Sequence, residues 1–233
     1  METKTEIKQS TKVFNVIILD KSGSMSSIAK QAIDGVNESI AAIKSRQEKH
    51  PEQNHVLTLV AFCGCELKKI YEQCPIGEVR PITSSDYQPC CMTPLYDAMG
   101  NTITALHRIM EGEKSAIASV TIITDGYENA SQEFSHKAIR SLVEAYKNEG
   151  WLFAYIGADH DVESVAFGLA IDNRMRFEKT NEGTRHMFNR FQACLGDYVD
   201  EVAPVMSCLE LDDDEKKSRL RASSKGFFKR RKI

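Results

Sequence analysis

The chain has 233 residues, of which 42% are hydrophobic and 27% charged, and its formal net charge is −3. This composition is close to that of soluble globular proteins and excludes a disordered or collagen-like chain. The length suits one large domain, or one domain with a tail. No apolar run approaches the roughly 20 residues that a membrane-spanning helix needs, and residues 1–12 are polar and charged. We therefore expect a cytoplasmic protein without a membrane span.

Short apolar runs rich in β-branched residues predict strands that alternate with amphipathic helices. The predicted strands are Val13–Leu19, His55–Phe62, Glu66–Gln73, Ser119–Thr124, Trp151–Ile156 and a weak Met175–Glu178. Helical spacing of apolar residues predicts helices around residues 33–43, 95–110, 139–146, 162–170 and 184–202. The link Cys63–Cys65 is too short for a crossover, so the second and third strands should form an antiparallel hairpin. The pattern predicts an α/β fold, in which a doubly wound, mostly parallel six-stranded sheet has one antiparallel edge strand and helices on both faces.

The predicted domain covers residues 12–203, with an N-terminal extension at residues 1–11 and a charged tail at residues 204–233. From Glu210 onward, five acidic and nine basic residues give a local charge of +4 with few apolar side chains. We expect this tail to be disordered. Its basic end, Lys225–Lys232, could touch nucleic acid or an anionic membrane surface. Eight residues offer too few phosphate contacts for tight binding, so no nucleic-acid partner is expected.

Three polar loops fall where the predicted strands end. Asp20, Ser22 and Ser24 follow the first strand, Thr93 precedes a helix, and Asp125 follows the fourth strand. Ligands of open α/β sheets bind at the carboxyl ends of the strands, so these side chains should converge if the first and fourth strands are neighbours. They offer only oxygen atoms, which suits Mg²⁺, Mn²⁺ or Ca²⁺ and disfavours zinc or copper. A cation held by neutral hydroxyl groups remains electrophilic and would bind a carboxylate from outside.

These residues also carry a resemblance. The segment Asp20-Lys21-Ser22-Gly23-Ser24 matches the DxSxS motif of von Willebrand factor A (vWA) domains, and Thr93 and Asp125-Gly126 match the remaining positions of their metal-ion-dependent adhesion site. On this basis residues 12–203 resemble that Rossmann-like family. The resemblance implies that Ser22, Ser24 and Thr93 ligate Mg²⁺ directly, while Asp20 and Asp125 act mostly through water. It also implies that an aspartate or glutamate of a partner protein completes the coordination.

A compact chain with a short tail and no export signal looks like the intracellular, stand-alone vWA domains of bacteria. The resemblance suggests AAA+ ATPases, kinases or phosphatases as partners, and nothing in the sequence selects one of them. The leading hypothesis is a non-enzymatic, metal-dependent protein-binding module.

Other interpretations use the same residues. Asp20, Ser22 and Ser24 could simply cap the helix that follows them. Asp20 could instead accept a phosphoryl group in a Mg²⁺-dependent phosphoryl-transfer or hydrolytic enzyme, but a haloacid-dehalogenase site needs a second aspartate where this chain has Ser22. A serine nucleophile would need a histidine base. The nearest candidate is His160, which we expect to be a surface-loop residue.

The seven cysteines are odd in number, and without an export signal we expect reduced thiols. Four of them, Cys63, Cys65, Cys90 and Cys91, could lie close together. Zinc binding or a redox role is then an alternative, although this spacing is unusual for a tetrahedral zinc site. We expect these four residues to be mostly buried or idle thiols.

Overall fold

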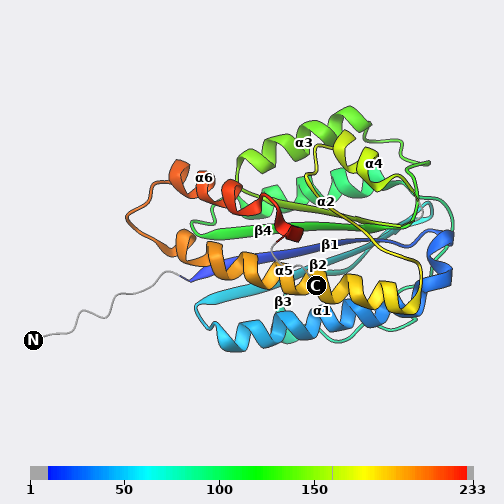
Figure 1. Ribbon diagram of the computed structural model, residues 1–233, viewed down its shortest axis with the longest axis horizontal. Coiled ribbons are helices and arrows are strands. Elements are labelled where there is room, and N and C mark those ends of the chain that lie inside the picture. The colour runs from blue at the N-terminus through cyan, green and yellow to red at the C-terminus, as the bar shows by residue number, and fades with distance from the viewer. Residues whose placement is uncertain (1–9, 159, 230–233) are drawn as a thin grey trace, which may run out of the picture.

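The protein is described by a computed structural model that covers residues 10–158 and 160–229. Its centre is a six-stranded sheet of order β3-β2-β1-β4-β5-β6 (Figure 1). The strands are β1 (Thr11–Asp20), β2 (Gln53–Cys63), β3 (Glu66–Pro75), β4 (Ala116–Thr124), β5 (Leu152–Gly157) and β6 (Asn173–Arg176). Only β3 pairs antiparallel within this sheet, and the other pairings are parallel. The predicted fold class is therefore confirmed. Most of the predicted N-terminal extension, residues 1–9, lies outside the described residues.

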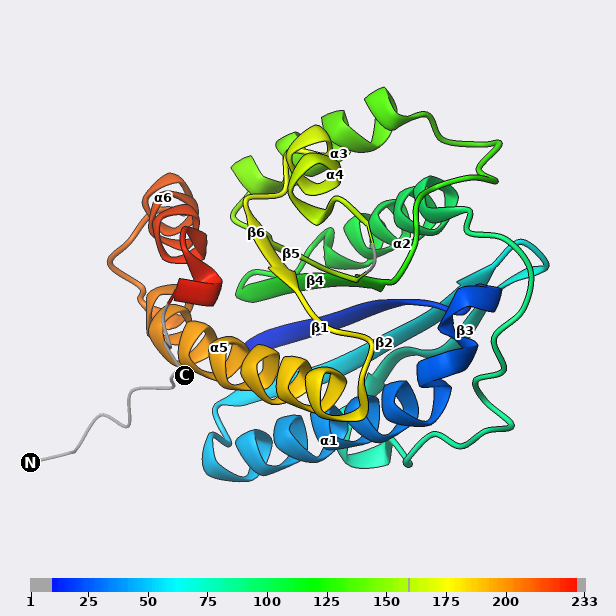
Figure 2. The same ribbon diagram turned by 45° about the vertical axis from the view of Figure 1, so that its right-hand side comes forward.

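Helices cover both faces of the sheet (Figure 2). One face packs against α1 (Ala29–Lys49) and α5 (Asn181–Ser207), and the other against α2 (Leu95–Met110), α3 (His136–Asn148) and α4 (Val162–Gly168). Successive side chains of β1 enter opposite cores, because a strand turns neighbouring side chains to opposite faces. Ile17 and Leu19 join the core under α1 and α5, whereas Val16 and Ile18 join the core under α2 and α3. This explains why the run is apolar on both faces of the strand, apart from the buried Asn15. Among the described residues, none of the helices combines the length and apolar character that crossing a bilayer requires.

The strand order reverses between β1 and β4. From β1 the chain moves to β2 and β3 on one side, and it returns through α2 to place β4 on the other side of β1. Leu19 lies opposite Ile123 in this parallel pairing, so Asp20 and Thr124 are the next residues of the two strands. The loops that leave β1 and β4 therefore meet at the edge of the sheet where such folds bind ligands.

The expectation of a disordered tail is wrong over the described residues. The domain helix α5 continues to Ser207, and a further helix, α6 (Asp213–Ser224), follows it. The acidic run that suggested disorder is the start of α6. The Asp212 side chain accepts a hydrogen bond from the Glu215 backbone nitrogen at 2.8 Å, and Glu215 accepts one from the Asp212 nitrogen at 3.4 Å. This capping box, together with acidic side chains near the positive helix end, stabilises the helix.

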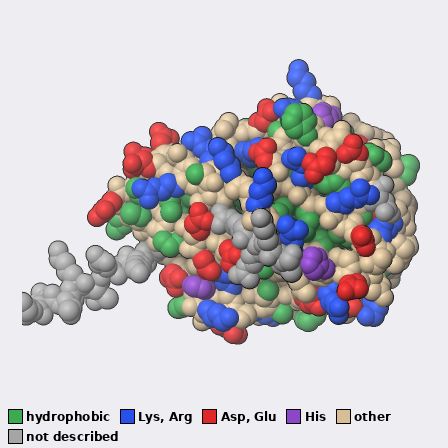
Figure 3. All heavy atoms as spheres, viewed as in Figure 1, with side chains coloured by type: hydrophobic (Ala, Val, Ile, Leu, Met, Phe, Trp, Pro, Cys, Tyr) green, Lys and Arg blue, Asp and Glu red, His purple; other side chains and the backbone are tan. Residues whose placement is uncertain are grey.

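Three apolar side chains dock the tail onto the domain. Leu220 of α6 is 3% exposed, and Phe227 and Phe228, in the short 3-10 helix η3 (Phe227–Lys229), are 0% and 6% exposed. The Phe227 backbone nitrogen also donates to the Asn173 side chain at 3.1 Å. The tail thus extends the core over the edge of the sheet at β6. On the face in Figure 3, Lys and Arg side chains are interspersed with Asp and Glu side chains across the described residues.

We predict that Leu220→Ala lowers the free energy of unfolding by about 2–4 kcal/mol, because it removes a buried side chain and leaves a cavity. Leu209 is the matched control, since it lies in the same tail and is 79% exposed. Leu209→Ala should change stability by less than about 0.5 kcal/mol. Denaturant titration of both variants tests this, and equal effects of the two substitutions would show that the tail is not docked.

Candidate functional site

Asp20 is the centre of the loops that meet beside β1 and β4. It is fully buried. Its Oδ1 accepts a hydrogen bond from the Ser22 backbone nitrogen at 2.6 Å, and its Oδ2 accepts one from the Thr124 hydroxyl at 2.6 Å. Burial raises the pKa of Asp20, and the negative charge of Asp125 raises it further, while the hydrogen bonds from Thr124 and Ser22 lower it. A cation nearby would stabilise the charged form of this carboxyl group.

Ser22, Ser24 and Asp125 form a chain of polar contacts next to Asp20. Ser22 precedes the short 3-10 helix η1 (Gly23–Ile28), and its Oγ lies 3.1 Å from the Oγ of Ser24. The Ser24 hydroxyl donates to Asp125 Oδ1 at 2.6 Å. Ser22 and Asp125 are buried, whereas Ser24 is exposed. The loop after β1 is therefore bonded directly to the loop after β4.

Thr93 reaches the same place from the entry to α2. It is 4% exposed, its nitrogen donates to the Asn129 side chain at 2.8 Å, and the Asn129 nitrogen donates back to the Thr93 carbonyl at 3.2 Å. A methyl group placed on Gly126 would lie 3.8 Å from both the Ser24 and the Thr93 hydroxyl oxygens. The two hydroxyl groups thus border a common space beside Gly126.

The structure brings together all five residues that the sequence singled out, namely Asp20, Ser22, Ser24, Thr93 and Asp125. Their role as metal ligands stays a prediction. We call this group the hydroxyl site. Its side-chain donors are carboxylate and hydroxyl oxygens, which are the ligands that hard divalent cations prefer.

The sequence did not reveal Lys179, which lies between β6 and α5. Its Nζ lies 2.7 Å from Asp125 Oδ2 and donates to the Ser24 carbonyl at 3.2 Å. A positive charge therefore already lies against the acidic part of the hydroxyl site. No local motif could have indicated this contact, because Lys179 is 155 residues from Ser24 in the chain.

Thr124 and Tyr87 were also missed. Thr124 immediately precedes Asp125, so its position at the strand end could have indicated that it belongs to the site. Tyr87 is 1% exposed, and its hydroxyl donates to the Asp20 carbonyl at 2.6 Å. Burial raises the pKa of Tyr87 well above its ordinary value, with a further contribution from the negative charges of Asp20 and Asp125. Tyr87 therefore remains a neutral donor that fixes the end of β1.

His160 is not the surface residue that we expected. It is 6% exposed, and its Nε2 lies 3.0 Å from the Tyr155 hydroxyl. Its other ring nitrogen contacts the carbonyl of Ala158. Both nitrogens are thus occupied by groups of β5 and of the loop that follows it, and neither contact involves Ser22 or Ser24.

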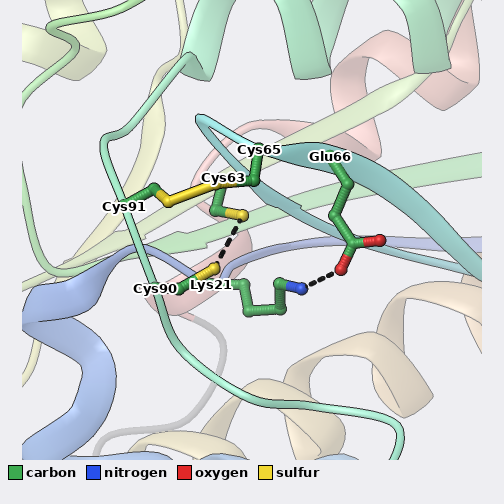
Figure 4. Close-up of a disulfide and its surroundings, with 6 residues drawn as sticks. All are labelled: Lys21, Cys63, Cys65, Glu66, Cys90 and Cys91. Atoms are coloured by element: carbon green, nitrogen blue, oxygen red, sulfur yellow. Dashed lines mark hydrogen bonds and ion pairs between the residues drawn. A yellow bond between two sulfur atoms is a disulfide. The ribbon is translucent and has the colours of Figure 1, made fainter.

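The expectation of idle thiols is wrong for two of the four neighbouring cysteines. Cys65 and Cys91 form a disulfide, with their Cα atoms 6.5 Å apart (Figure 4). Cys63 and Cys90 are free thiols whose sulfur atoms lie 3.2 Å apart. The group lies next to the hydroxyl site, because Cys91 precedes Thr93 by two residues.

No protein-family profile matches the chain, and no curated protein matches it. Its fold is nevertheless similar to solved structures. Proximal thread matrix protein 1 from the mussel byssus, with a zinc-occupied MIDAS motif, is 13% identical, with 82% of this chain and 47% of that one covered and a TM-score of 0.54. A von Willebrand factor type A protein from Catenulispora acidiphila is 16% identical, with 79% and 42% covered and a TM-score of 0.55.

The SpRpn10 VWA domain is 11% identical, with 77% of this chain and 95% of that domain covered and a TM-score of 0.53. The chain spans less than half the length of the first two proteins. At such low sequence identities, the similarity is evidence for the fold alone. The fold of this chain is that of a vWA domain.

Proposed function

We propose that this chain is a divalent-metal-dependent protein-binding module, in which a cation at the hydroxyl site binds an aspartate or glutamate of a partner. The observation that carries the proposal is the convergence of five oxygen-bearing side chains from three separate loops at the point where the strand order reverses. The vWA fold supports it, because the motif positions of that family fall at this edge of the sheet. The setting in a bacterial cytoplasm is part of the proposal and rests on the sequence resemblance.

The residues of the site fit a hard divalent cation. Two carboxylates, Asp20 and Asp125, lie beside three hydroxyl groups in a largely buried environment. The Lys179 ammonium lies 2.7 Å from Asp125 Oδ2, so the protein's own fold places a positive charge there. Ser22, Ser24 and Thr93 would hold the metal directly, and Asp20 and Asp125 would hold it through water. Mg²⁺ is the proposed ion, and Mn²⁺ or Ca²⁺ would suit the same donors.

A cation at this site would supply an electrophilic centre for a carboxylate. Its direct protein ligands would be neutral hydroxyl groups, which leave much of its charge uncompensated. A partner's carboxylate then adds the missing negative charge, and the surrounding loops select which partner fits. The proposed classes of partner are AAA+ ATPases, kinases and phosphatases.

The alternative is a Mg²⁺-dependent phosphoryl-transfer or hydrolytic enzyme that uses Asp20. The geometry favours it less. Both carboxylate oxygens of Asp20 accept hydrogen bonds from inside the protein, and the side chain is fully buried. A phosphoryl acceptor needs an oxygen that the substrate can reach. His160 is likewise engaged by Tyr155 and Ala158, which weakens the case for a serine nucleophile.

We predict that the wild-type protein binds one equivalent of Mg²⁺ or Mn²⁺, and that Ser22→Ala/Ser24→Ala abolishes this binding because it removes two of the three direct ligands. Isothermal titration calorimetry measures both. The matched control is Ser26→Ala/Ser27→Ala, which changes two exposed serines of the same 3-10 helix. Equal metal binding by the wild type and the Ser22/Ser24 variant would contradict the proposed site.

Lys179 should weaken metal binding, because its ammonium group already neutralises part of the negative charge of Asp125 that would attract a cation. We predict that Lys179→Met tightens Mn²⁺ binding roughly tenfold, equivalent to about 1.4 kcal/mol. The control is Lys30→Met, since the Lys30 side chain is 82% exposed and pairs with Asp34 on α1. Unchanged or weaker Mn²⁺ binding by the Lys179 variant would show that this lysine does not compete with the cation.

Binding of a partner should depend on the metal. We expect proteins retained by the immobilised chain in Mg²⁺ to be released by a chelator, and Thr93→Ala to reduce their retention more than it reduces bare metal binding. The reason is that a carboxylate ligand favours the arrangement with more neutral direct ligands, and such a coupling typically amounts to about 1–3 kcal/mol. Partner retention that survives both the chelator and the substitution would exclude the metal as the bridge.

A further inference from the structure

The proposed function does not use the group of cysteines beside the hydroxyl site, which we call the sulfur cluster: Cys63, Cys65, Cys90 and Cys91. Cys63 ends β2, Cys65 follows in the turn to β3, and the other two lie in the loop that leads to Thr93. Figure 4 shows the four side chains pointing toward one another from these two segments. The sulfur atoms of Cys63, Cys65 and Cys90 all lie within 4.8 Å of one another, and the fourth sulfur is bonded to Cys65.

Backbone hydrogen bonds hold the loop of Cys90 and Cys91 in place independently of the disulfide, one of them to the β2–β3 turn and two to the segment that follows β1. The Gly64 nitrogen donates to the Met92 carbonyl at 2.8 Å. The Cys90 nitrogen donates to the Lys21 carbonyl at 2.8 Å, and the Gly23 nitrogen donates to the Cys91 carbonyl at 3.0 Å. Breaking the sulfur–sulfur bond would therefore leave the cysteines side by side.

Four sulfur atoms so arranged have the dimensions of a thiolate metal site. Zinc–sulfur bonds of about 2.3 Å place the sulfurs of a tetrahedral site about 3.8 Å apart. The Cys63 and Cys90 sulfurs are 3.2 Å apart, which is close to this spacing, and the Cys65 and Cys91 sulfurs would have to separate once their bond is broken. Soft thiolate ligands favour Zn²⁺ over the hard cations expected at the hydroxyl site.

Lys21 places a positive charge beside the sulfur cluster. Its ammonium group forms an ion pair with Glu66 and lies close enough to the Cys63 and Cys90 sulfurs to interact with them electrostatically (Figure 4). Four thiolates around one divalent ion carry a net charge of about −2. The hydrogen bond with Cys63 and burial raise the pKa of Cys90, and the Lys21 charge opposes this shift. The same ammonium group would offset part of the negative charge of a thiolate site.

We propose that the sulfur cluster is a second metal site, which binds Zn²⁺ through its four thiolates when the Cys65–Cys91 disulfide is reduced. A dithiol reductant donates two electrons and two protons, so that the protein disulfide becomes two thiols and the reductant becomes a disulfide. Zn²⁺ then replaces the thiol protons, which pass to the buffer. Cys65 and Cys91 are both exposed, so a reductant can reach the bond. Zinc and the disulfide exclude each other, because the same two sulfurs serve both.

The test uses Co²⁺ as a spectroscopic probe, because Co²⁺ gives intense charge-transfer absorption when thiolates are its ligands. Reduced, metal-free protein should develop this absorption with one equivalent of Co²⁺ and lose it when Zn²⁺ is added. Protein with the disulfide intact should not develop it. Cys63→Ser, Cys90→Ser and the exposed Cys65→Ser should each lose or strongly reduce the signal, whereas the control Cys74→Ser/Cys208→Ser should keep it.

A reduced wild type without thiolate absorption would overturn the proposal, as would a signal that persists in Cys63→Ser/Cys90→Ser. Three single variants guard against one of them failing to fold, and circular dichroism confirms that each is folded. Ser22→Ala/Ser24→Ala should keep the Co²⁺–thiolate absorption while losing Mg²⁺ binding. The failure of one metal site is thereby distinguished from the failure of the other.

Discussion

The buried carboxylate of Asp20 is the constraint around which the functional edge of the protein is built. A carboxylate out of contact with water is costly unless hydrogen bonds or cations compensate it. Here the Thr124 hydroxyl and the Ser22 backbone nitrogen donate to its two oxygens, and this joins the end of β1 to the end of β4. The same contacts set the loop that carries Ser22 and Ser24. Because Asp20 and Asp125 are both buried, their carboxylates also need a positive charge nearby.

The protein meets this need with a side chain from a distant part of the sequence. Lys179 contacts Asp125 from the loop before α5, while Lys21, which follows Asp20 in the chain, pairs with Glu66 beside the sulfur cluster. The two proposed metal sites would thus share one loop, residues 90–93, and differ in chemistry. Oxygen donors select a hard cation, and sulfur donors select a soft one. The disulfide or a bound zinc ion at the sulfur cluster would therefore constrain the backbone that presents Thr93.

Much of this arrangement was predictable from the sequence, and the reasons are local. The strand positions followed from continuous apolar runs, and the site positions followed from polar residues directly after them. Contacts between distant segments were not predictable in this way. The docking of α6 depends on Leu220 and two phenylalanines within an otherwise polar stretch, whose low hydrophobicity suggested disorder. The Cys65–Cys91 bond depends on a hairpin turn meeting a long loop, and the burial of His160 depends on Tyr155.

The proposed function requires a divalent cation to bind among the hydroxyl groups of Ser22, Ser24 and Thr93. The most direct measurement is the anomalous X-ray scattering of Mn²⁺ in crystals of the full chain. We expect one strong anomalous peak bordered by these three side chains, with the Lys179 ammonium moved away from Asp125. A peak elsewhere, or none at this site at a saturating Mn²⁺ concentration, would contradict it.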